Sequence, residues 1–261
     1  MARVRATHHG EGRRGAAAAS CAHEPGAGRW DQTRRRGNRH RHSYQPAERR
    51  FRVTRNLLDV LAEHRGLRIT IITKSPLVTR DLDLLARIAE RSRISVHVSL
   101  ISADRDLARR LEPRAPTPEA RLRAIARLRS AGIEVGVNVM PVLPGITDST
   151  AALDALVQGI AKSNASYVGA CALRLRRTAR ERYLQVIDAD FPALAEKYRR
   201  AYAHGHQVGD AYREALSARM SAICARHGVK YGRYYETESG DDDIATEGLL
   251  RVAEQQLAFE I

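Results

Sequence analysis

The sequence of 261 residues is long enough for one α/β domain with a substantial core, or for two small domains. Its three cysteines, Cys21, Cys171 and Cys224, are widely spaced, which argues against a disulfide framework and against a cysteine-held metal site within this chain. No apolar run approaches the roughly 18 residues that span a bilayer, and the start lacks a signal-peptide pattern. We therefore expect a cytoplasmic protein with no membrane partner.

The formal net charge of +14 is unevenly distributed along the chain. Residues 1–50 contain 12 Arg against 4 acidic residues, whereas the remainder contains 32 basic and 26 acidic residues. Because residues 1–42 show almost no apolar periodicity, we predict a disordered, basic, low-complexity segment there. A nucleic-acid-binding arm is an alternative interpretation, although the only tryptophan, tyrosine or phenylalanine in the segment is Trp30.

From Tyr44 onward, apolar periodicity alternates between that of helices and that of strands. Helices are predicted over residues 46–64, 80–91, 117–132 and 149–162, and strands over residues 68–74, 94–100, 133–140 and 166–173. This alternation predicts βαβ units and a parallel sheet. We expect an incomplete parallel (β/α) barrel over residues 43–177, a helical extension over 178–228, and a tail with a possible terminal helix over 229–261.

The strands carry the main functional signal, because one of their faces is apolar and the other is small or polar. The polar face is formed by Thr70, Lys74, Ser95, His97, Ser99, Gly136 and Asn138. Of these, Lys74, Ser99 and Asn138 lie near the carboxyl ends of their strands, where barrel proteins build their active sites. The pattern predicts a ligand-binding lumen rather than a filled core.

Each of these residues also has a simpler alternative role. Lys74 would then reach solvent, Ser99 would bond the backbone, and Asn138 would satisfy a neighbouring loop. His97 lies mid-strand and is expected to be a hydrogen-bonded interior group rather than a ligand. The two later cysteines are expected to be small buried hydrophobic residues, and the chain from Tyr231 onward is expected to be solvated.

Four segments resemble, in order, motifs of spore-photoproduct-lyase-like (SplB-type) members of the radical S-adenosylmethionine (SAM) superfamily. The segments are YQPAER at 44–49, TKSPLVTRD at 73–81, LEPRAP at 111–116 and PVLPGITD at 141–148. The helical region 191–228 is also similar to the C-terminal part of such proteins. The resemblance extends from about residue 43 to residue 228.

This resemblance implies a partial TIM barrel of the (β/α)6 type and a lyase-like enzyme. In the family, a CxxxCxxC motif holds a [4Fe-4S] cluster that cleaves SAM to a 5′-deoxyadenosyl radical, with ferredoxin or flavodoxin as electron donor in intact members. Carried over by motif, Lys74 would pair with the SAM carboxylate, and Ser99 and Asn138 would bond its polar groups. The loop of Pro144, Gly145 and Ile146 would pack on adenine.

The chain departs from the family because CxxxCxxC is missing upstream of Tyr44, where Cys21 is alone. We therefore expect no metal ligands, no catalysis by this chain, and only weak SAM binding. The composition of residues 1–42 is also typical of GC-rich DNA read out of register, so we expect a truncated or frameshifted start. A genuine disordered arm fused to a degenerate barrel is the alternative.

Two other functions remain open from the sequence. One is a different (β/α)-barrel lyase that uses Lys74 to form a Schiff base, a role that a desolvated lysine can fill. The other is a non-catalytic, basic protein associated with nucleic acid, whose binding would weaken steeply with salt.

Overall fold

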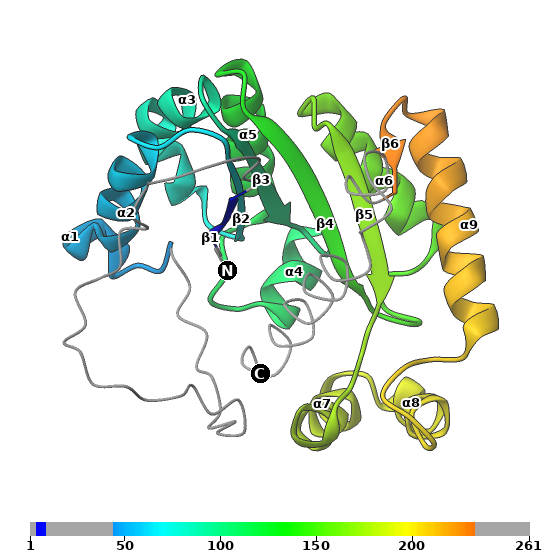
Figure 1. The fold of residues 1–261 in the computed structure, drawn as a ribbon. Coiled ribbons are helices and arrows are strands. Elements are labelled where there is room, and N and C mark those ends of the chain that lie inside the picture. Colours follow the sequence, from blue (N-terminus) through cyan, green and yellow to red (C-terminus); the bar gives the residue numbers. More distant parts are fainter. Residues whose placement is uncertain (1–3, 9–43, 233–261) are drawn as a thin grey trace.

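A computed structural model describes residues 4–8 and 44–232. The strands are β1 (Val4–His8), β2 (Leu67–Thr73), β3 (Arg93–Ser99), β4 (Glu134–Val142), β5 (Tyr167–Ala172) and β6 (Lys230–Tyr231). The helices are α1 (Glu48–Phe51), α2 (Val53–Ala62), η1 (Pro76–Asp81), α3 (Leu82–Ala89), α4 (Arg105–Leu111), α5 (Pro118–Ser130), α6 (Thr150–Lys162), α7 (Arg177–Asp190), η2 (Pro192–Leu194), α8 (Ala195–Ala201) and α9 (Asp210–Arg226). Figure 1 shows these elements as one α/β unit.

The sheet has the order β1-β2-β3-β4-β5-β6. Strand β1 is antiparallel to β2, and every later neighbour pair is parallel. Within the described ranges the sheet stays open, as an incomplete barrel does. The predicted fold class, an incomplete parallel (β/α) barrel with a helical C-terminal extension, is confirmed.

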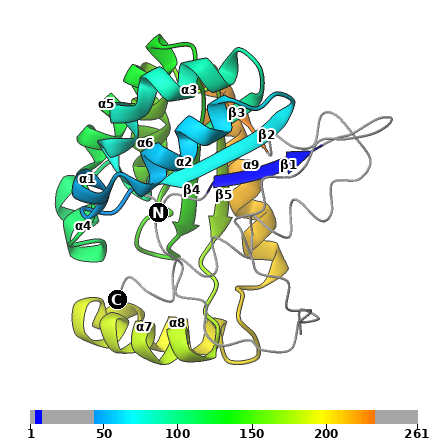
Figure 2. The same ribbon diagram turned by 60° about the vertical axis from the view of Figure 1, so that its left-hand side comes forward.

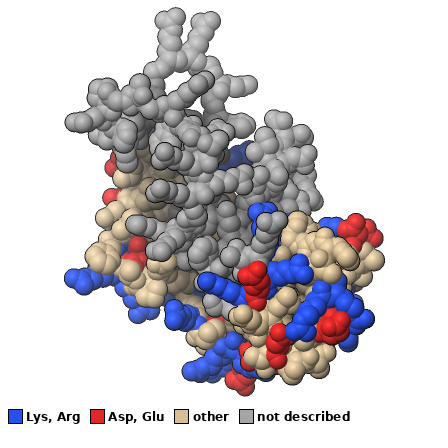
Figure 3. Space-filling model, turned by 90° about the horizontal axis from the view of Figure 1, so that it is seen from below, with Lys and Arg blue, Asp and Glu red and all other residues tan. Residues whose placement is uncertain are grey.

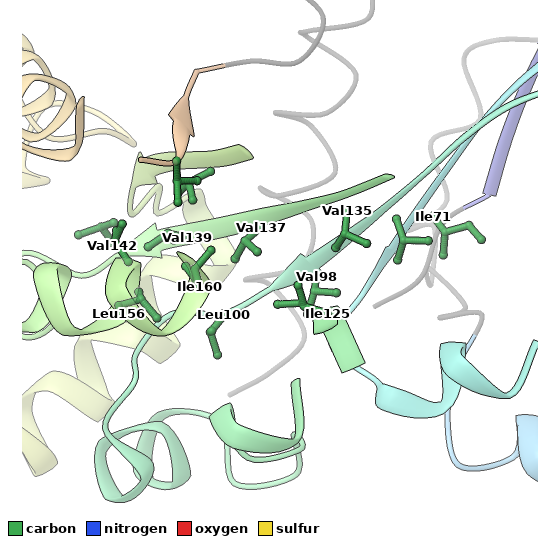
Figure 4. Close-up of a cluster of buried hydrophobic side chains, with 14 of the residues drawn as sticks. Ile71, Val98, Leu100, Ile125, Val135, Val137, Val139, Val142, Leu156 and Ile160 are labelled. Carbon is green, nitrogen blue, oxygen red and sulfur yellow. The ribbon is translucent and has the colours of Figure 1, made fainter. Parts of the chain in front are cut away.

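The apolar face of the sheet packs beneath helices, as the strand alternation predicts. Val96, Val135 and Val137 are fully buried there. Helices α3, α5 and α6 contribute apolar side chains at helical spacing, and Figure 4 shows Ile125, Leu156 and Ile160 packed against the valines of the strands. Burial of this face is the main stabilising contribution to the fold and leaves the polar face for another role.

The helix predicted over residues 46–64 is divided in two at Arg52, whose φ of 51° lies in the left-handed region. The carboxylate of Glu48 accepts hydrogen bonds from the backbone N–H groups of Thr54 (3.0 Å) and Arg55 (3.3 Å). These amides belong to the first turn of α2, where they have no intrahelical partner. The break therefore gives Glu48 the role of an N-terminal cap, which apolar periodicity does not reveal.

Two further elements differ from the sequence-based expectations. Strand β1 lies inside the segment predicted to be disordered, where it pairs with the backbone of β2, whose other edge is occupied by β3. Residues 9–42 lie outside the described ranges. Helix α4 was not predicted; its N-terminus is capped by Asp104, which accepts from the N–H groups of Asp106 and Leu107.

The expectation of a solvated tail from Tyr231 onward is also wrong for the first residues of that tail. Tyr231 belongs to β6, which continues the sheet beside β5, and the N–H of Gly232 donates to the carbonyl of Val168 at 3.1 Å. Gly228, with φ of 67°, turns the chain from α9 into this strand. Residues 233–261 lie outside the described part of the chain.

The C-terminal extension is helical but interrupted between α8 and α9. Figures 1 and 2 place α7 and α8 beyond the ends of the strands, away from the helices that cover the apolar face. No helix among the described residues is long and apolar enough to cross a membrane.

Candidate ligand site on the polar face of the sheet

The register of the sheet aligns the three residues predicted at the strand ends. Thr73 pairs with Val98, so that Lys74 and Ser99 follow side by side, and Ser99 pairs with Asn138. Asn138 in turn pairs with Gly169 of β5. One level of the polar face, extending across four strands, therefore carries an ammonium, a hydroxyl, an amide and a glycine.

The level below closes the lumen with an aromatic and a histidine. A Cβ atom at Gly136 would overlap the ring of Tyr167, so glycine is needed for the ring to lie across β4. The Tyr167 hydroxyl lies 2.6 Å from Nε2 of His97, and the two rings meet edge to face with centroids 5.4 Å apart.

His97 is buried, and its ring also meets the hydroxyl of Ser95 at 3.4 Å and the side chain of Asn138. Desolvation lowers the pKa of His97 to about 4, against an ordinary value of 6.5. The ring is therefore neutral near pH 7. The predicted role of His97 as a hydrogen-bonded interior group is confirmed.

Lys74 belongs to a buried ionic triad that the sequence did not indicate. Its Nζ lies 2.9 Å from Oε1 of Glu112, whose Oε2 accepts a hydrogen bond of 2.5 Å from Arg121. All three side chains are more than nine-tenths buried. Two cations and one anion give the triad a formal charge of +1.

Burial alone would raise the pKa of the Glu112 carboxyl, but the charges of Lys74 and Arg121 and their hydrogen bonds lower it below its ordinary value. Arg121 also donates to the carbonyls of Ser99 and Pro116, each at 2.9 Å. It therefore fastens the end of β3 to the turn that carries Glu112.

Sequence reasoning missed the other two members of the triad, Glu112 and Arg121. The signal for Arg121 was its spacing, because positions 121, 125 and 128 share one face of α5 and place the arginine on the same side as two core residues. Glu112 lies in the LEPRAP segment, but its partner Lys74 is 38 positions away in the sequence. The alternative interpretation of Lys74, a side chain that reaches solvent, is wrong, since the side chain is buried.

The backbone around Lys74 is held on both sides. The Thr73 hydroxyl accepts from the N–H of Ser75 at 2.9 Å, and the Ser75 hydroxyl caps η1 by accepting from the N–H of Leu77 at 3.3 Å. These turns fix the point at which β2 ends. These hydrogen bonds fix the backbone of the TKSP segment, from which the side chain of Lys74 reaches Glu112.

An ionic network joins the YQPAER and TKSPLVTRD segments in the folded chain. Arg80 donates to the Glu48 carboxylate at 2.9 Å and to Asp81, which also accepts from the hydroxyl of Tyr44 at 3.1 Å. Arg55 donates to Asp81 as well, at 3.0 Å. Burial would raise the pKa of Asp81, but the bonds from the two arginines lower it. The network attaches the end of η1 to α1 and α2.

The predicted adenine loop makes its contacts with the C-terminal extension. The carbonyl of Pro144 accepts from the hydroxyl of Tyr198 at 2.8 Å, and Gly145, with φ of 73°, faces the side chain of Leu194. Ile146 packs at the edge of the core. This loop lies beyond β4, so it belongs to the same end of the sheet as Asn138 but not to its level.

The two cysteines of the described ranges differ in their surroundings. Cys224 is fully buried, as expected, whereas Cys171 is only half-buried and lines a cavity of about 770 Å³ between β5 and α9. The expectation that Cys171 is buried is therefore wrong. The cavity reaches the polar face at Gly169 and Met140, beside the level of Asn138.

A [4Fe-4S] cluster does not fit the residues that the structure describes. Nowhere in these ranges do three His, Cys, Asp or Glu side chains gather as a metal-binding group. Cys21 lies outside them. The donor set of Lys74, Ser99 and Asn138, in contrast, fits the amino-acid end of SAM, since a carboxylate pairs with an ammonium and accepts from a hydroxyl and an amide.

The fold is an α/β incomplete barrel, and this level of donors on its polar face is the candidate ligand site. Residues 42–156 match the Radical SAM superfamily. This matched segment of the chain is similar to the radical SAM superfamily, as its motifs suggested.

Curated relatives are similar over part of their length. Uncharacterized protein Rv2578c of Mycobacterium tuberculosis is 38% identical over 184 residues, covering 70% of this chain and 54% of that protein. Uncharacterized protein MJ0683 of Methanocaldococcus jannaschii is 33% identical over 106 residues, covering 41% and 39%. The chain spans about half the length of the mycobacterial relative that it matches.

Solved structures with a similar fold include spore photoproduct lyase complexed with dinucleoside spore photoproduct, at 17% identity and a TM-score of 0.46 over 68% of this chain and 54% of that chain. A mutant of the same lyase with bound AdoMet and the dinucleoside has 17% identity and a TM-score of 0.48, with the same coverage. Methylornithine synthase has 14% identity and a TM-score of 0.40 over 80% and 64%.

Proposed function

We propose that this chain binds SAM on the polar face of its sheet and does not cleave it. The observation that carries the proposal is the alignment of Lys74, Ser99 and Asn138 at one level of three adjacent strands. Similarity to the radical SAM superfamily supports SAM as the ligand.

The charge of the site supports an anionic group on the ligand. The buried triad of Lys74, Glu112 and Arg121 has a formal charge of +1, and charges act over longer range in a buried site than in water. Lys74 would pair with the SAM carboxylate, using another of the three donor hydrogens of its ammonium.

The remaining donors would orient the rest of the ligand. The amide of Asn138 has two donors and an acceptor, so its bond to His97 leaves capacity for a ligand. The Ser99 hydroxyl lies beside it in register. Packing of the 144–146 loop on adenine completes the proposal, and the contacts of this loop with Leu194 and Tyr198 would fix its position.

Cleavage of SAM requires an electron, which the [4Fe-4S] cluster supplies in the family. The three cysteines of these 261 residues, at positions 21, 171 and 224, cannot form CxxxCxxC. The function proposed for the chain as it stands is therefore binding alone.

Isothermal titration calorimetry of SAM with the wild-type chain, Lys74→Met and Lys162→Met tests this proposal. Lys162 is a matched control, because it lies on the outer helix α6 and its ammonium bonds the exposed Gln158. We expect micromolar to millimolar dissociation constants for the wild type. The Lys74 variant should bind about tenfold more weakly, since a hydrogen bond to a charged group is lost.

Equal affinity of all three proteins would exclude Lys74 from the site. An absence of binding by the wild type at millimolar SAM would overturn the proposal itself.

The competing Schiff-base lyase is less well supported by the geometry. The Glu112 carboxylate lies 2.9 Å from Nζ of Lys74 and stabilises the charged ammonium, which is not nucleophilic. A protein that binds nucleic acid would be expected to have a surface on which basic side chains cluster. Figure 3 instead shows basic and acidic side chains interspersed on the described part of the face that carries α7 and α8.

A further inference from the structure

The position of Glu112 has a consequence for ligand selection. Its carboxylate reaches the strand-end level from the turn after α4 and occupies Lys74 at 2.9 Å. Lys74 is the cation that the proposed function assigns to the ligand carboxylate. Two carboxylates, one from the protein and one from the ligand, would then share a single ammonium.

Arg121 holds the carboxylate of Glu112 in position. Its guanidinium holds Oε2 of Glu112 at 2.5 Å and is itself fastened to the carbonyls of Ser99 and Pro116. An arginine with three such bonds is a rigid anchor, whereas a lysine ammonium rotates on a flexible stem. Arg121 therefore holds Glu112 as a fixed negative charge beside Lys74.

We propose that Glu112 is a specificity-determining residue that competes with the ligand carboxylate for Lys74 and so limits the preference of the site for carboxylate-bearing adenosyl ligands. The inference rests on the proposed function. A ligand that keeps the adenosine and lacks the amino-acid group would not meet this competition. The ion pair of Lys74 and Glu112 lies in a buried environment, where it is weakly screened, so the ligand carboxylate has to compete with it.

Two adenosyl compounds differ in the amino-acid group: S-adenosylhomocysteine carries its carboxylate and ammonium, and 5′-methylthioadenosine lacks both. A third compound, the decarboxylated amine of S-adenosylhomocysteine, keeps the ammonium and lacks only the carboxylate, and it should bind Glu112→Gln no more tightly than the wild type. The measurement is the dissociation constant of each compound, by calorimetry, for the wild-type chain and Glu112→Gln. We expect Glu112→Gln to tighten S-adenosylhomocysteine binding about tenfold, because the ligand carboxylate no longer shares the Lys74 ammonium with a second carboxylate, and to leave 5′-methylthioadenosine binding unchanged.

A double-mutant cycle assigns the effect to Lys74. In the Lys74→Met background, Glu112→Gln should no longer alter the ratio of the two dissociation constants, because the contested ammonium is gone. Glu63→Gln is the matched control for net charge, since Glu63 is exposed at the end of α2, and it should leave both constants unchanged.

Glu112→Asp keeps the test decisive if Glu112→Gln fails to fold. Its shorter side chain retains the negative charge and withdraws it from Lys74, so S-adenosylhomocysteine should again bind more tightly than it binds the wild type. Circular dichroism verifies folding of each variant.

The outcomes separate the two proposals. Binding of S-adenosylhomocysteine with a ratio that neither Glu112 variant changes would overturn the role of Glu112 and leave the ligand site standing. If neither compound binds the folded wild type, the proposed function fails, and the role of Glu112 fails with it.

Discussion

His97 connects the polar face to the pH dependence of stability. Burial lowers its pKa to about 4 in the folded protein, against 6.5 for an ordinary histidine. As the pH falls through 6.5, the unfolded chain takes up this proton first. The folded state therefore loses stability between pH 6.5 and about 4, by about 3 kcal/mol in total, and gains nothing further from this group above pH 6.5.

The substitution His97→Gln tests this contribution. Urea unfolding between pH 4 and pH 7.5 should show a flatter decline in the free energy of unfolding for the variant than for the wild type. Carboxylates such as Glu112 and Asp81 have lowered pKa values and also make stability depend on pH. Because both proteins contain these carboxylates, their contribution cancels when the free energy of unfolding of the variant is subtracted from that of the wild type. Parallel curves would contradict burial of a neutral His97.

At the same scale, the structure separates two kinds of polar residue on the strands. Ser95, His97 and Tyr167 satisfy one another below the proposed site and contribute to its floor. Lys74, Ser99 and Asn138 lie one level higher. Lys74 follows β2 and Ser99 ends β3, but Asn138 lies in the middle of β4, so its predicted position near a strand end is wrong. The alternation of the sequence assigned residues from both levels to a single face, and the register of the sheet distinguishes them.

At the scale of the element, α1 and α2 expose several large apolar side chains. Phe51, Val53, Leu57 and Val60 are 62%, 66%, 45% and 50% exposed, whereas Leu58 is fully buried. Leu57 and Leu58 are adjacent residues of the same type in the same helix. They form a matched pair for measuring what the buried side of α2 contributes to stability.

Leu58→Ala should lower the free energy of unfolding by about 2–5 kcal/mol, because it removes buried methyl groups and leaves a cavity. Leu57→Ala should change it by less than about 1 kcal/mol, since an exposed side chain is shortened and alanine favours the helix. Urea denaturation of both variants measures the difference. Similar losses for the two would show that a partner surface covers Leu57 in solution.

The division of α1 from α2 shows why periodicity alone misplaces such boundaries. Apolar spacing is compatible with one helix through residue 62, and Arg52 carries no sequence signal for a left-handed conformation. The break depends on Glu48, which caps α2 and at the same time binds Arg80 from η1. That contact joins residues 32 positions apart.

At the scale of the whole molecule, the cysteine content predicts the outcome of cluster reconstitution. After anaerobic treatment with iron and sulfide, we expect the purified chain to remain colourless, because Cys21 is isolated and Cys224 is buried. The measurement is the absorbance at about 400 nm together with iron and sulfide content. About four irons and four sulfides per chain with stable absorbance would show that other residues supply ligands.

The amino-acid sequence by itself determined the class of fold, the apolar face and the candidate lumen residues of this protein. Helical and strand periodicities are local properties of the chain, and they are enough to order the βαβ units and to separate the two faces of each strand. The four motifs, read in order, also identified the superfamily, which the match over residues 42–156 confirms.

Only the tertiary structure decided which charges meet. Glu112 joins Lys74 and Arg121 in a buried triad, and Glu48 joins Arg80 and Asp81 in a second network. The Lys74–Glu112 and Glu48–Arg80 contacts connect residues that are far apart in the sequence. An isolated charge costs too much to bury, so each of these side chains can be inside only because its partners are there too. Such pairing depends on how the helices and loops meet at the strand ends, and this arrangement exists only in the folded chain.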